Sequence, residues 1–481
     1  MISHLFRGKR VHLVGIGGAG VSALVPLLSE AGAIVSGCDC ERSLISERLR
    51  RAGLEVHDRH DPAHVEGVDL VVHTAAVPAD HPELAAARAR GIEVIARGEC
   101  LVRLMHGNRT VAIAGSHGKT STTWMTAHLL LSHGLDPVVM VGGAVGSIGG
   151  GGRVGQGDIF VAETDESDGS FARIRPDLAV VTNLDREHLR HYGSFSALES
   201  AFQAWLASVP ADGLVVLPTD GISSAITSGV MAPVLRVGLE SGDYHAQRLE
   251  LGAEGSRLRV IERGIDIGEM QVPLPGAHMA LNALMALALA RRLDQRIAPV
   301  AMATCERVRR RFTVHGTPRG VRVVEDYGHH PTEVRATIAA ARLAGGRVHV
   351  LFQPHRPSRT ADLWREFVAA FDQAHALALL PIYAASEPPI AGITSQVLAD
   401  AIAQRRRVST SDDVGGQVLH ADDADAAIAF LAAHAGPGDT ILVLGAGDVG
   451  AAAPTLVEAL NATPAQPAKS VGWLDRLRRF A

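Results

Sequence analysis

An apolar run that leads into a glycine turn and a Gly-Lys-Thr triplet constrains this chain more than any other feature. Residues 111–114 are Val-Ala-Ile-Ala, residues 115–121 are Gly-Ser-His-Gly-Lys-Thr-Ser, and a helix is expected over residues 124–133. A strand, a turn and a helix in this order form a phosphate-binding loop, because backbone N–H groups at the helix start point at an anion. Lys119 is then placed to bind the outer phosphates, and Thr120 to bind Mg²⁺. The alternative is an ordinary glycine turn, since the Gly-x-x-Gly-Lys-Thr spacing is shorter than the usual pattern.

Lysine usage supports the phosphate-binding interpretation. The chain has 46 Lys and Arg residues together, yet only Lys9, Lys119 and Lys469 are lysine. Arginine has replaced lysine nearly everywhere except in this loop. A planar guanidinium does not substitute for a compact ammonium between phosphate oxygens, so a role in phosphate binding explains why this lysine is kept.

Bulk composition narrows the function classes. The 481 residues suffice for about three domains, and 47% hydrophobic with 20% charged residues is typical of a globular chain. A net charge of −5 with no basic tail gives no sign of nucleic-acid binding, and no apolar run predicts membrane insertion. Four scattered cysteines favour a reducing, cytoplasmic setting. Cys38 and Cys40 form one Cys-x-Cys pair, which without a second pair is interpreted as two small residues at a strand end.

A second glycine turn lies near the N-terminus. A strand at residues 11–14 precedes a Gly-x-Gly-x-x-Gly turn, an apolar helix to residue 31, and a strand at residues 33–37 that leads to Asp39. This βαβ pattern predicts binding of a nucleotide diphosphate, with Asp39 accepting from a ribose hydroxyl. The same unit alone would also suit a dinucleotide-dependent oxidoreductase, but that function leaves the phosphate loop unexplained. The turn residues assigned to the substrate diphosphate are Gly15, Gly17, Gly18 and Gly20.

Strands and helices alternate along the whole chain, which predicts α/β domains with parallel sheets covered on both faces. We expect a Rossmann-like domain at residues 1–107, a central phosphate-loop α/β domain at 108–312, and a C-terminal Rossmann-like α/β domain at 313–465. A loose tail is expected at 466–481, with a short basic amphipathic helix over 471–480 as one option. The glycine-rich stretch 142–157 is interpreted as a flexible surface loop.

Acids and histidines follow several of the predicted strands, at the edge where open α/β sheets bind ligands. Glu163 and His188 come after consecutive strands of the central domain and predict a Mg²⁺ site near the phosphate loop. The alternatives are a solvated acidic loop for Glu163 and a capping histidine for His188. In the third domain residues 326–331 read Asp-Tyr-Gly-His-His-Pro, and a helix cap explains the proline but not both histidines. Residues 353–360 add arginines suited to a phosphate or carboxylate.

Nine segments in order along the chain resemble the Mur ligase family. They are residues 12–20, 114–120, 163–168, 181–183, 275–278 with 282–283, 310–312, 326–333, 352–356 and 445–448. The resemblance implies a three-domain ligase in which ATP phosphorylates the carboxylate of UDP-N-acetylmuramate and an amine attacks the acyl phosphate. The alanine-adding branch is the best match, with L-alanine as the amine donor. A related branch that attaches a recycled tripeptide is the alternative, and a non-catalytic paralogue is disfavoured by the intact motifs.

The resemblance also implies roles for individual residues. Those assigned to ATP are Gly115, Ser116, His117, Gly118, Lys119, Thr120, Ser121, Asn282, Arg311 and Asp326. Those assigned to metal are Thr120, Glu163 and His188, and the catalytic set is Lys119, His188, Asp326 and His330. Those assigned to the substrates in the third domain are Tyr327, His329, His355, Arg356 and Arg359.

Some relatives carry a carbamoylated lysine after the central histidine, and this chain has no lysine there. The corresponding place falls near Phe202, and Lys119 is the only lysine of the central domain. We therefore expect no carbamoyl-lysine, as in the alanine-adding branch. The expected assembly is a monomer or weak homodimer in the cytoplasm.

Overall fold

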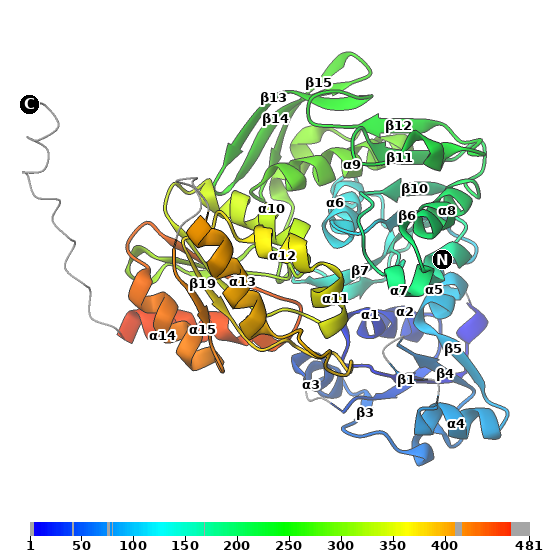
Figure 1. Cartoon of the computed structure of the whole chain (residues 1–481). Helices are drawn as coiled ribbons and strands as arrows, with labels where there is room; N and C mark the ends of the chain where they lie inside the picture. Colours follow the sequence, from blue (N-terminus) through cyan, green and yellow to red (C-terminus); the bar gives the residue numbers. More distant parts are fainter. Residues whose placement is uncertain are drawn as a thin grey trace, which may run out of the picture. The chain divides into compact units, whose positions relative to one another are not determined.

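The computed structural model describes residues 4–40, 43–74, 77–78, 80–167, 169–408 and 416–462. The chain forms two compact units, Met1–Phe312 and Thr313–Ala481, and its described strands form three sheets (Figure 1). The expected tail and its optional helix lie outside the described residues. Among the described residues, no helix has the length and apolar character needed to cross a bilayer.

The first sheet has five parallel strands. In spatial order they are β3 (Glu55–His57), β2 (Ile34–Cys38), β1 (Arg10–Val14), β4 (Leu70–His73) and β5 (Glu93–Ala96). This order places the switch point between β1 and β4, where a doubly wound sheet binds its ligand. Its helices are α1 (Ala19–Ser22), α2 (Leu24–Glu30), α3 (Leu44–Arg51), α4 (Pro82–Ala89) and α5 (Arg97–Met105), with the 3-10 turns η1 (His4–Phe6) and η2 (Pro62–Val65). The single helix predicted after the first turn is therefore divided in two at Ala23.

The second sheet has ten strands. In spatial order they are β15 (Ile265–Val272), β14 (Gly255–Glu262), β13 (Tyr244–Gly252), β12 (Val234–Val237), β11 (Leu214–Pro218), β10 (Leu178–Val181), β6 (Arg109–Ala114), β9 (Ile159–Glu163), β7 (Val138–Val145) and β8 (Gly150–Arg153). The strands from β12 to β7 are parallel, whereas β13–β15 form an antiparallel meander over the stretch with short β-like runs. Strand β6 is buried from Thr110 to Ala114 and lies between β9 and β10, so its carboxyl end faces the loops that follow both neighbours.

Two long apolar helices cover one face of this sheet. They are α6 (Lys119–Ser132) and α9 (Ala277–Leu293), which pack on each other. The remaining helical elements of the sheet are α7 (Leu189–Tyr192), α8 (Phe195–Leu206), η3 (Ser170–Arg173), η4 (Ser224–Thr227) and η5 (Pro299–Thr304). Phe202 lies in the core with Phe171 and Trp205. The predicted helix over 124–133 thus begins five residues earlier, directly after the glycine turn.

The prediction of a flexible loop over residues 142–157 is wrong. This stretch contains the end of β7 and all of β8, which pair as an antiparallel hairpin. A side chain at Gly152 would overlap the backbone oxygen of Ala23 and lie 2.9 Å from Pro26 Cγ. The glycines therefore serve close packing of the hairpin against the α1–α2 junction, a contact distant in sequence that local composition does not reveal.

The second unit contains a six-stranded sheet. In spatial order its strands are β16 (Thr313–Gly316), β17 (Arg322–Asp326), β21 (Thr440–Leu444), β18 (Val348–Phe352), β19 (Ala376–Leu379) and β20 (Val418–His420). Only β16 is antiparallel to its neighbour. Its helices are α10 (Pro331–Arg342), α11 (Pro357–Asp362), α12 (Trp364–Ala370), α13 (Ser395–Val408), α14 (Ala424–His434) and α15 (Ala452–Ala462), with η6 (Pro318–Gly320) and η7 (Asp448–Ala451). The strands predicted at 348–352 and 440–444 are confirmed, and the three sheets confirm the α/β fold class.

Candidate active site

The turn between β6 and α6 has a backbone that only glycine adopts without strain. Gly115 has φ +126° and Gly118 has φ +79°. A Cβ at Gly115 would lie 2.9 Å from the backbone nitrogen of Thr182, and one at Gly118 would lie 2.8 Å from Asn282 Oδ1. Both glycines are therefore required by conformation and by space. The turn places the N-terminus of the 14-residue helix α6 at its opening, as the phosphate-loop prediction requires.

Residues after the neighbouring strand β10 hold this turn in place. The backbone N–H of His117 donates to Asn183 Oδ1 at 2.9 Å, and Asn183 Nδ2 donates back to the His117 carbonyl at 2.9 Å. The Thr182 hydroxyl donates to the same carbonyl at 2.6 Å. The Ser116 hydroxyl accepts from the backbone N–H of Asp185 at 2.9 Å. The loop is thus rigid before any ligand arrives, which lowers the entropic cost of binding.

Lys119 lies at the centre of the turn. Its Nζ donates to the Gly115 carbonyl at 2.5 Å, to the Ser116 carbonyl at 3.2 Å and to Glu166 Oε1 at 2.8 Å. Burial acts to lower the pKa of Lys119, but the charges of Glu166 and Asp165 outweigh it and raise the pKa, so the ammonium stays charged. Burial, assisted by the neighbouring Asp165, raises the pKa of Glu166 to about 7 although Lys119 acts to lower it.

Thr120 and Glu163 form a pair of oxygen donors beside the lysine. The Thr120 hydroxyl donates to Glu163 Oε1 at 3.1 Å, and the other carboxylate oxygen accepts from the Gly142 backbone N–H at 2.6 Å. Arg311 Nη2 lies 3.4 Å from the Thr120 hydroxyl, so the last residues of the first unit also lie beside this oxygen pair. Hydroxyl and carboxylate oxygens suit a hard divalent cation such as Mg²⁺.

His188 lies with two other acids. Its Nε2 is 3.6 Å from Glu166 Oε1 and 3.5 Å from Glu187 Oε2, and the three residues offer ligand atoms within 4.8 Å of one another. His188 also precedes α7 as its N-cap residue, with φ +54°. Glu166 therefore connects His188 to Lys119, whereas Glu163 contacts Thr120.

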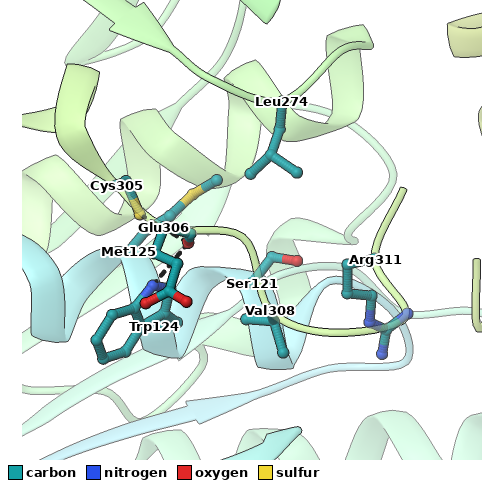
Figure 2. Close-up of a pocket in the computed structure, with 8 residues that line it drawn as sticks. All are labelled: Ser121, Trp124, Met125, Leu274, Cys305, Glu306, Val308 and Arg311. Atoms are coloured by element: carbon teal, nitrogen blue, oxygen red, sulfur yellow. Dashed lines mark hydrogen bonds between the residues drawn. The ribbon is translucent and has the colours of Figure 1, made fainter. Parts of the chain in front are cut away.

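The first two turns of α6 are bordered by the segment that closes the first unit. A small, open pocket lies there, lined by Ser121, Trp124, Met125, Leu274, Cys305, Glu306, Val308 and Arg311 (Figure 2). Trp124 Nε1 donates to the Glu306 carbonyl at 2.8 Å, shown as a dashed line, and Arg311 lies at the opposite end of the group. Asn282 is not among the lining residues but is buried in α9 against Gly118. Arg310 and Phe312 have φ +60° and +49°, a strained backbone at the boundary between the units.

The N-terminal glycine turn is held by the acid that follows β2. Gly17 donates its backbone N–H to Asp39 Oδ2 at 2.9 Å. Gly15 has φ +84°, and Gly20 lies against the side chain of Arg97. Arg97 also pairs with Asp165 at 2.9 Å, so the first sheet is linked to the loop that follows β9. The structure thus places Asp39 against the turn, with Gly18 exposed.

In the second unit, Asp326 ends β17 and His330 begins α10. Asp326 Oδ1 accepts from the Gly328 backbone N–H at 2.8 Å. His330 is itself the N-cap, since its Nδ1 accepts from the Thr332 backbone N–H at 3.2 Å. The carboxylate of Glu333 accepts from the backbone N–H groups of His329 and His330 at 3.0 and 3.3 Å. The helix-cap alternative therefore accounts for one of the two adjacent histidines.

The other histidine belongs to a ring cluster. Tyr327 and His329 meet edge to face at 5.3 Å, and His329 meets His355 in the same way at 5.7 Å. His355 stacks on Tyr383 at 5.4 Å with nearly parallel rings. One cluster of aromatic and imidazole rings thus forms from residues that follow β17, β18 and β19.

The two arginines after β18 are held at the start of α11. Arg359 Nη1 donates to His355 Nδ1 at 3.2 Å. Arg356, the N-cap residue with φ +74°, lies 3.7 Å from Glu387. Both side chains are only partly buried, so each retains access to an anion.

The sequence interpretation missed four residues that shape these sites. They are Thr182, Asn183, Glu166 and Tyr383. The signal for the first three was present, because each is a polar residue within three positions of a buried strand end. Tyr383 lies four residues beyond β19 in an irregular stretch, and nothing local identifies it.

Three family models match the chain in succession. The Mur ligase family catalytic domain matches residues 10–109, the Mur ligase middle domain 113–290, and the Mur ligase glutamate ligase domain 310–447. The UDP-N-acetylmuramate--L-alanine ligase of Sorangium cellulosum is 43% identical over 477 residues, covering 97% of this chain and 100% of that protein. The chain belongs to the Mur ligase family.

Further Mur ligases agree with this assignment. The UDP-N-acetylmuramate--L-alanine ligase of Symbiobacterium thermophilum is 42% identical over 470 residues, 95% of this chain and 96% of that protein. The crystal structure of UDP-N-acetylmuramate-alanine ligase MurC from Thermotoga maritima matches with a TM-score of 0.78 and 26% identity, over 94% of this chain and 99% of that one. A murein peptide ligase from Psychrobacter arcticus shares the fold, with a TM-score of 0.70 and 23% identity over 95% and 100% of the two chains. The predicted family is therefore confirmed, and Mur ligases are ATP-dependent.

Proposed function

We infer that this Mur ligase joins L-alanine to the carboxylate of UDP-N-acetylmuramate in peptidoglycan precursor synthesis. The observation that carries this function is the identity of 42–43% to UDP-N-acetylmuramate--L-alanine ligases over 95–97% of the chain. A muramyl carboxylate oxygen attacks the γ-phosphorus of ATP, and ADP leaves. The amine of L-alanine then attacks the acyl carbon, phosphate leaves, and the amine loses a proton as the amide forms. We place the reaction in the cytoplasm, in keeping with four free cysteines.

We propose that the turn at residues 115–121 binds the ATP phosphates. Backbone N–H groups at the start of α6 would face the phosphate oxygens, with Gly115, Ser116, His117, Gly118 and Ser121 forming the wall. Lys119 would exchange its contact with Glu166 for a phosphate oxygen, which keeps the ammonium charge paired throughout. Asn282, packed on Gly118, and Arg311, beside Thr120, would border the nucleotide. Cations that neutralise charge on the transferred phosphoryl group lower the barrier to transfer.

The oxygen pair of Thr120 and Glu163 fits Mg²⁺, because both are hard donors 3.1 Å apart beside the phosphate turn. His188 with Glu166 and Glu187 fits a second cation, since its three donors lie within 4.8 Å. Bound Mg²⁺ would supply positive charge to the phosphate oxygens. Glu163 would hold it in the orientation set by the Gly142 N–H, and His188 would contribute its Nε2, which lies 3.6 Å from Glu166 Oε1.

We propose that the turn at residues 15–20 binds the UDP diphosphate, with Asp39 fixing the turn and facing the ribose. In the second unit, Tyr327, His329, His355, Arg356 and Arg359 would form the amino-acid and carboxylate side of the reaction. Asp326 and His330, at the strand end and helix cap, would complete the catalytic set. This division corresponds to domains at residues 1–107, 108–312 and 313–465, and it is supported by one glycine turn in each of the first two and the ring cluster in the third.

Phosphate release from the purified full chain tests this function. The assay contains ATP, Mg²⁺ and UDP-N-acetylmuramate, with L-alanine, a recycled-type tripeptide, or neither. We expect release that requires both UDP-N-acetylmuramate and L-alanine, with the amide product confirmed by mass spectrometry. Release with the tripeptide alone would assign the chain to the recycling branch. Release independent of either acceptor or amine would identify an uncoupled nucleotidase instead.

A further inference from the structure

A buried cluster of metal-ligating side chains lies in the first unit, next to the base of the N-terminal glycine turn and apart from the turn after β6. It is on the face of the first sheet that packs against η2 and α4. Along β1, Val11 and Leu13 belong to the core under α2, whereas Val14 belongs to the small core with Leu84. Because side chains alternate along a strand, His12 points into the same layer as Val14.

Four different elements contribute one donor residue each to this cluster. They are His12 from β1, Cys38 from the end of β2, His64 from η2 and Glu83 from α4. One ligand atom from each lies within 4.8 Å of all the others. Three of the four side chains are completely buried, and His64 is 11% exposed. A thiol, two imidazoles and a carboxylate from non-adjacent segments are a donor set that no single motif of the sequence displays.

Glu83 is the centre of the cluster. One carboxylate oxygen lies 2.7 Å from His64 Nδ1 and 3.7 Å from His12 Nε2. The other lies 2.9 Å from Cys38 Sγ. A tetrahedral site with metal–nitrogen and metal–sulfur bonds of about 2.0–2.3 Å separates its ligands by roughly 3.3–3.6 Å, so small side-chain shifts convert this arrangement into a coordination sphere.

The imidazole rings are oriented from outside the cluster. His12 Nδ1 is hydrogen-bonded to the Ser36 hydroxyl at 2.9 Å, which turns Nε2 toward Glu83. That Nε2 is buried and makes no hydrogen bond to the described residues. His57 stacks on His64 with ring centroids 3.8 Å apart and planes within 8°. Such outer contacts fix the ring orientation of histidines that bind metals.

We propose that His12, Cys38, His64 and Glu83 bind one zinc-class divalent cation as a closed structural site. Thiolate and imidazole donors select a borderline-soft metal such as Zn²⁺ over Mg²⁺. Four protein ligands leave no open position for a substrate, so the ion holds β1, β2, η2 and α4 together. Because Asp39 directly follows Cys38 and accepts from Gly17, the ion also anchors the base of the N-terminal glycine turn.

The competing explanation is a metal-free hydrogen-bond network around a buried glutamate. His60 contributes to such a network, with Nδ1 3.2 Å from Glu83 and 3.1 Å from Cys38 Sγ. The backbone N–H of Asp61 also donates to Glu83 at 3.2 Å. Metal titration separates the two explanations, since only coordination brings the Cys38 sulfur onto an ion.

Cobalt titration of the tag-free full chain tests the site. The protein is stripped with a chelator under reducing conditions, and Co²⁺ is added without nucleotide. We expect one equivalent to produce a thiolate-to-cobalt charge-transfer band and tetrahedral visible bands, and Zn²⁺ to abolish both. Wild-type protein that shows neither band, and no zinc by elemental analysis as isolated, would overturn the proposal. Octahedral binding at an oxygen site gives no thiolate band, so the ATP site does not interfere.

Two thiol variants form a matched pair. Cys38→Ser is expected to lose the charge-transfer band, whereas Cys40→Ser, which removes the exposed thiol two residues away, keeps it. Loss of the band in both variants, or in neither, would contradict coordination by Cys38.

A histidine variant provides an independent test in case Cys38→Ser does not fold. We expect His64→Gln to weaken Co²⁺ binding by at least about tenfold. Zn²⁺ should raise the Tm of stripped wild-type protein and leave that of His64→Gln nearly unchanged. Equal thermal shifts in the two proteins would overturn the assignment of His64.

Discussion

The two glycine turns of the first unit follow central strands of parallel sheets, but different means hold them in place. The turn after β1 opens onto α1, a helix of four residues, and is held by one carboxylate, since Gly17 donates to Asp39 at 2.9 Å. The turn after β6 opens onto α6, a helix of 14 residues, and is held by reciprocal hydrogen bonds between His117 and Asn183. Only the second turn contains a lysine.

This difference separates positioning from charge neutralisation. A diphosphate that remains intact needs a turn whose backbone approaches it closely. A carboxylate such as that of Asp39 can hold such a turn by accepting a hydrogen bond from its backbone. A phosphoryl group that is transferred needs positive charge close to its oxygens, and we propose that Lys119 supplies it. The buried Glu166 keeps that lysine oriented and paired, whereas residues 15–20 of the first turn contain no charged side chain. Five predictions test this division, from the largest expected effect to the smallest.

Lys119→Ala should separate the two turns most sharply. We expect phosphate release to fall by about a thousandfold or more, because the transferred group loses its fixed cation. Binding of UDP-N-acetylmuramate, measured by calorimetry, should stay within about twofold, since the first turn is intact. Lys9→Ala, at an exposed lysine beside β1, is the matched control and should retain activity. Equal loss of ATP turnover and UDP-sugar binding would show that the turns are not independent.

Alanine at a glycine position should also act unequally on the two turns. Gly115→Ala combines φ +126° with a Cβ placed 2.9 Å from the Thr182 backbone, which cannot move aside. A Cβ at Gly17 would meet only side chains, Asp39 Oδ2 at 2.8 Å and Ser43 Oγ at 3.0 Å, and both can rotate. We expect Gly115→Ala to reduce ATP-dependent turnover about a hundredfold and Gly17→Ala to raise the KM for UDP-N-acetylmuramate about tenfold. Similar kinetics of the two variants would contradict the difference in rigidity.

The pH dependence of stability should report the buried ion pair of the second turn. In the folded protein the pKa of Glu166 is raised to about 7 from an ordinary 4.5, chiefly by burial. Between the ordinary pKa of 4.5 and the folded-state pKa of about 7, Glu166 binds more protons in the folded state than in the unfolded state. Its contribution therefore lowers the free energy of unfolding as the pH rises through this range. Urea unfolding of wild type and Glu166→Gln should show a difference in stability that changes by on the order of 2–3 kcal/mol between about pH 4.5 and about pH 7.5. Parallel pH profiles would remove Glu166 as a titrating group.

Glu163→Gln should shift the metal requirement of the second turn alone. The amide keeps an oxygen for the Gly142 N–H but loses the negative charge that attracts Mg²⁺. We expect the Mg²⁺ concentration for half-maximal activity to rise about tenfold, measured by titration at saturating ATP. Asp39→Asn, the matched change at the first turn, should leave this titration unaltered. An unchanged Mg²⁺ titration in Glu163→Gln would remove that residue from the metal site.

Removing the side chains that hold each turn in place should give the smallest effects. Each change should affect only the substrate bound by that turn. Asn183→Ala removes both hydrogen bonds to His117, and we expect the KM for ATP to rise about fivefold. Asp39→Ala releases the Gly17 N–H, and we expect a similar rise in the KM for UDP-N-acetylmuramate. Steady-state kinetics with each substrate varied will measure both. A rise in the other substrate's KM would indicate coupling between the turns.

Much of this organisation was predictable from local sequence. The phosphate turn, Lys119 and the diphosphate turn with Asp39 each depend on residues within about 25 positions, which a strand–turn–helix unit brings together. The strands at 348–352 and 440–444 were also predictable, because each is a short apolar run between turn residues. Family membership followed from the order of nine such local segments.

Other features depended on contacts between distant segments. The glycines of β8 resembled a loop until their packing on Ala23 was visible, and Asn183 was an unassigned polar residue until β10 was placed beside β6. The clearest case is Cys38, interpreted as a small residue at a strand end, whose sulfur lies 2.9 Å from Glu83, 45 positions away.

The sequence by itself determined the α/β class, the family and the two glycine turns, one of which contains Lys119, because turn geometry and charge are encoded over short stretches of chain. The tertiary structure alone decided which polar side chains share a site, because the order of strands in a sheet joins residues that no sequence spacing relates. Lys119 was therefore predictable, whereas its pairing with Glu166, 47 positions away, was not. The same reason explains why the donor set around Glu83 becomes visible only when four separate elements close on one buried carboxylate.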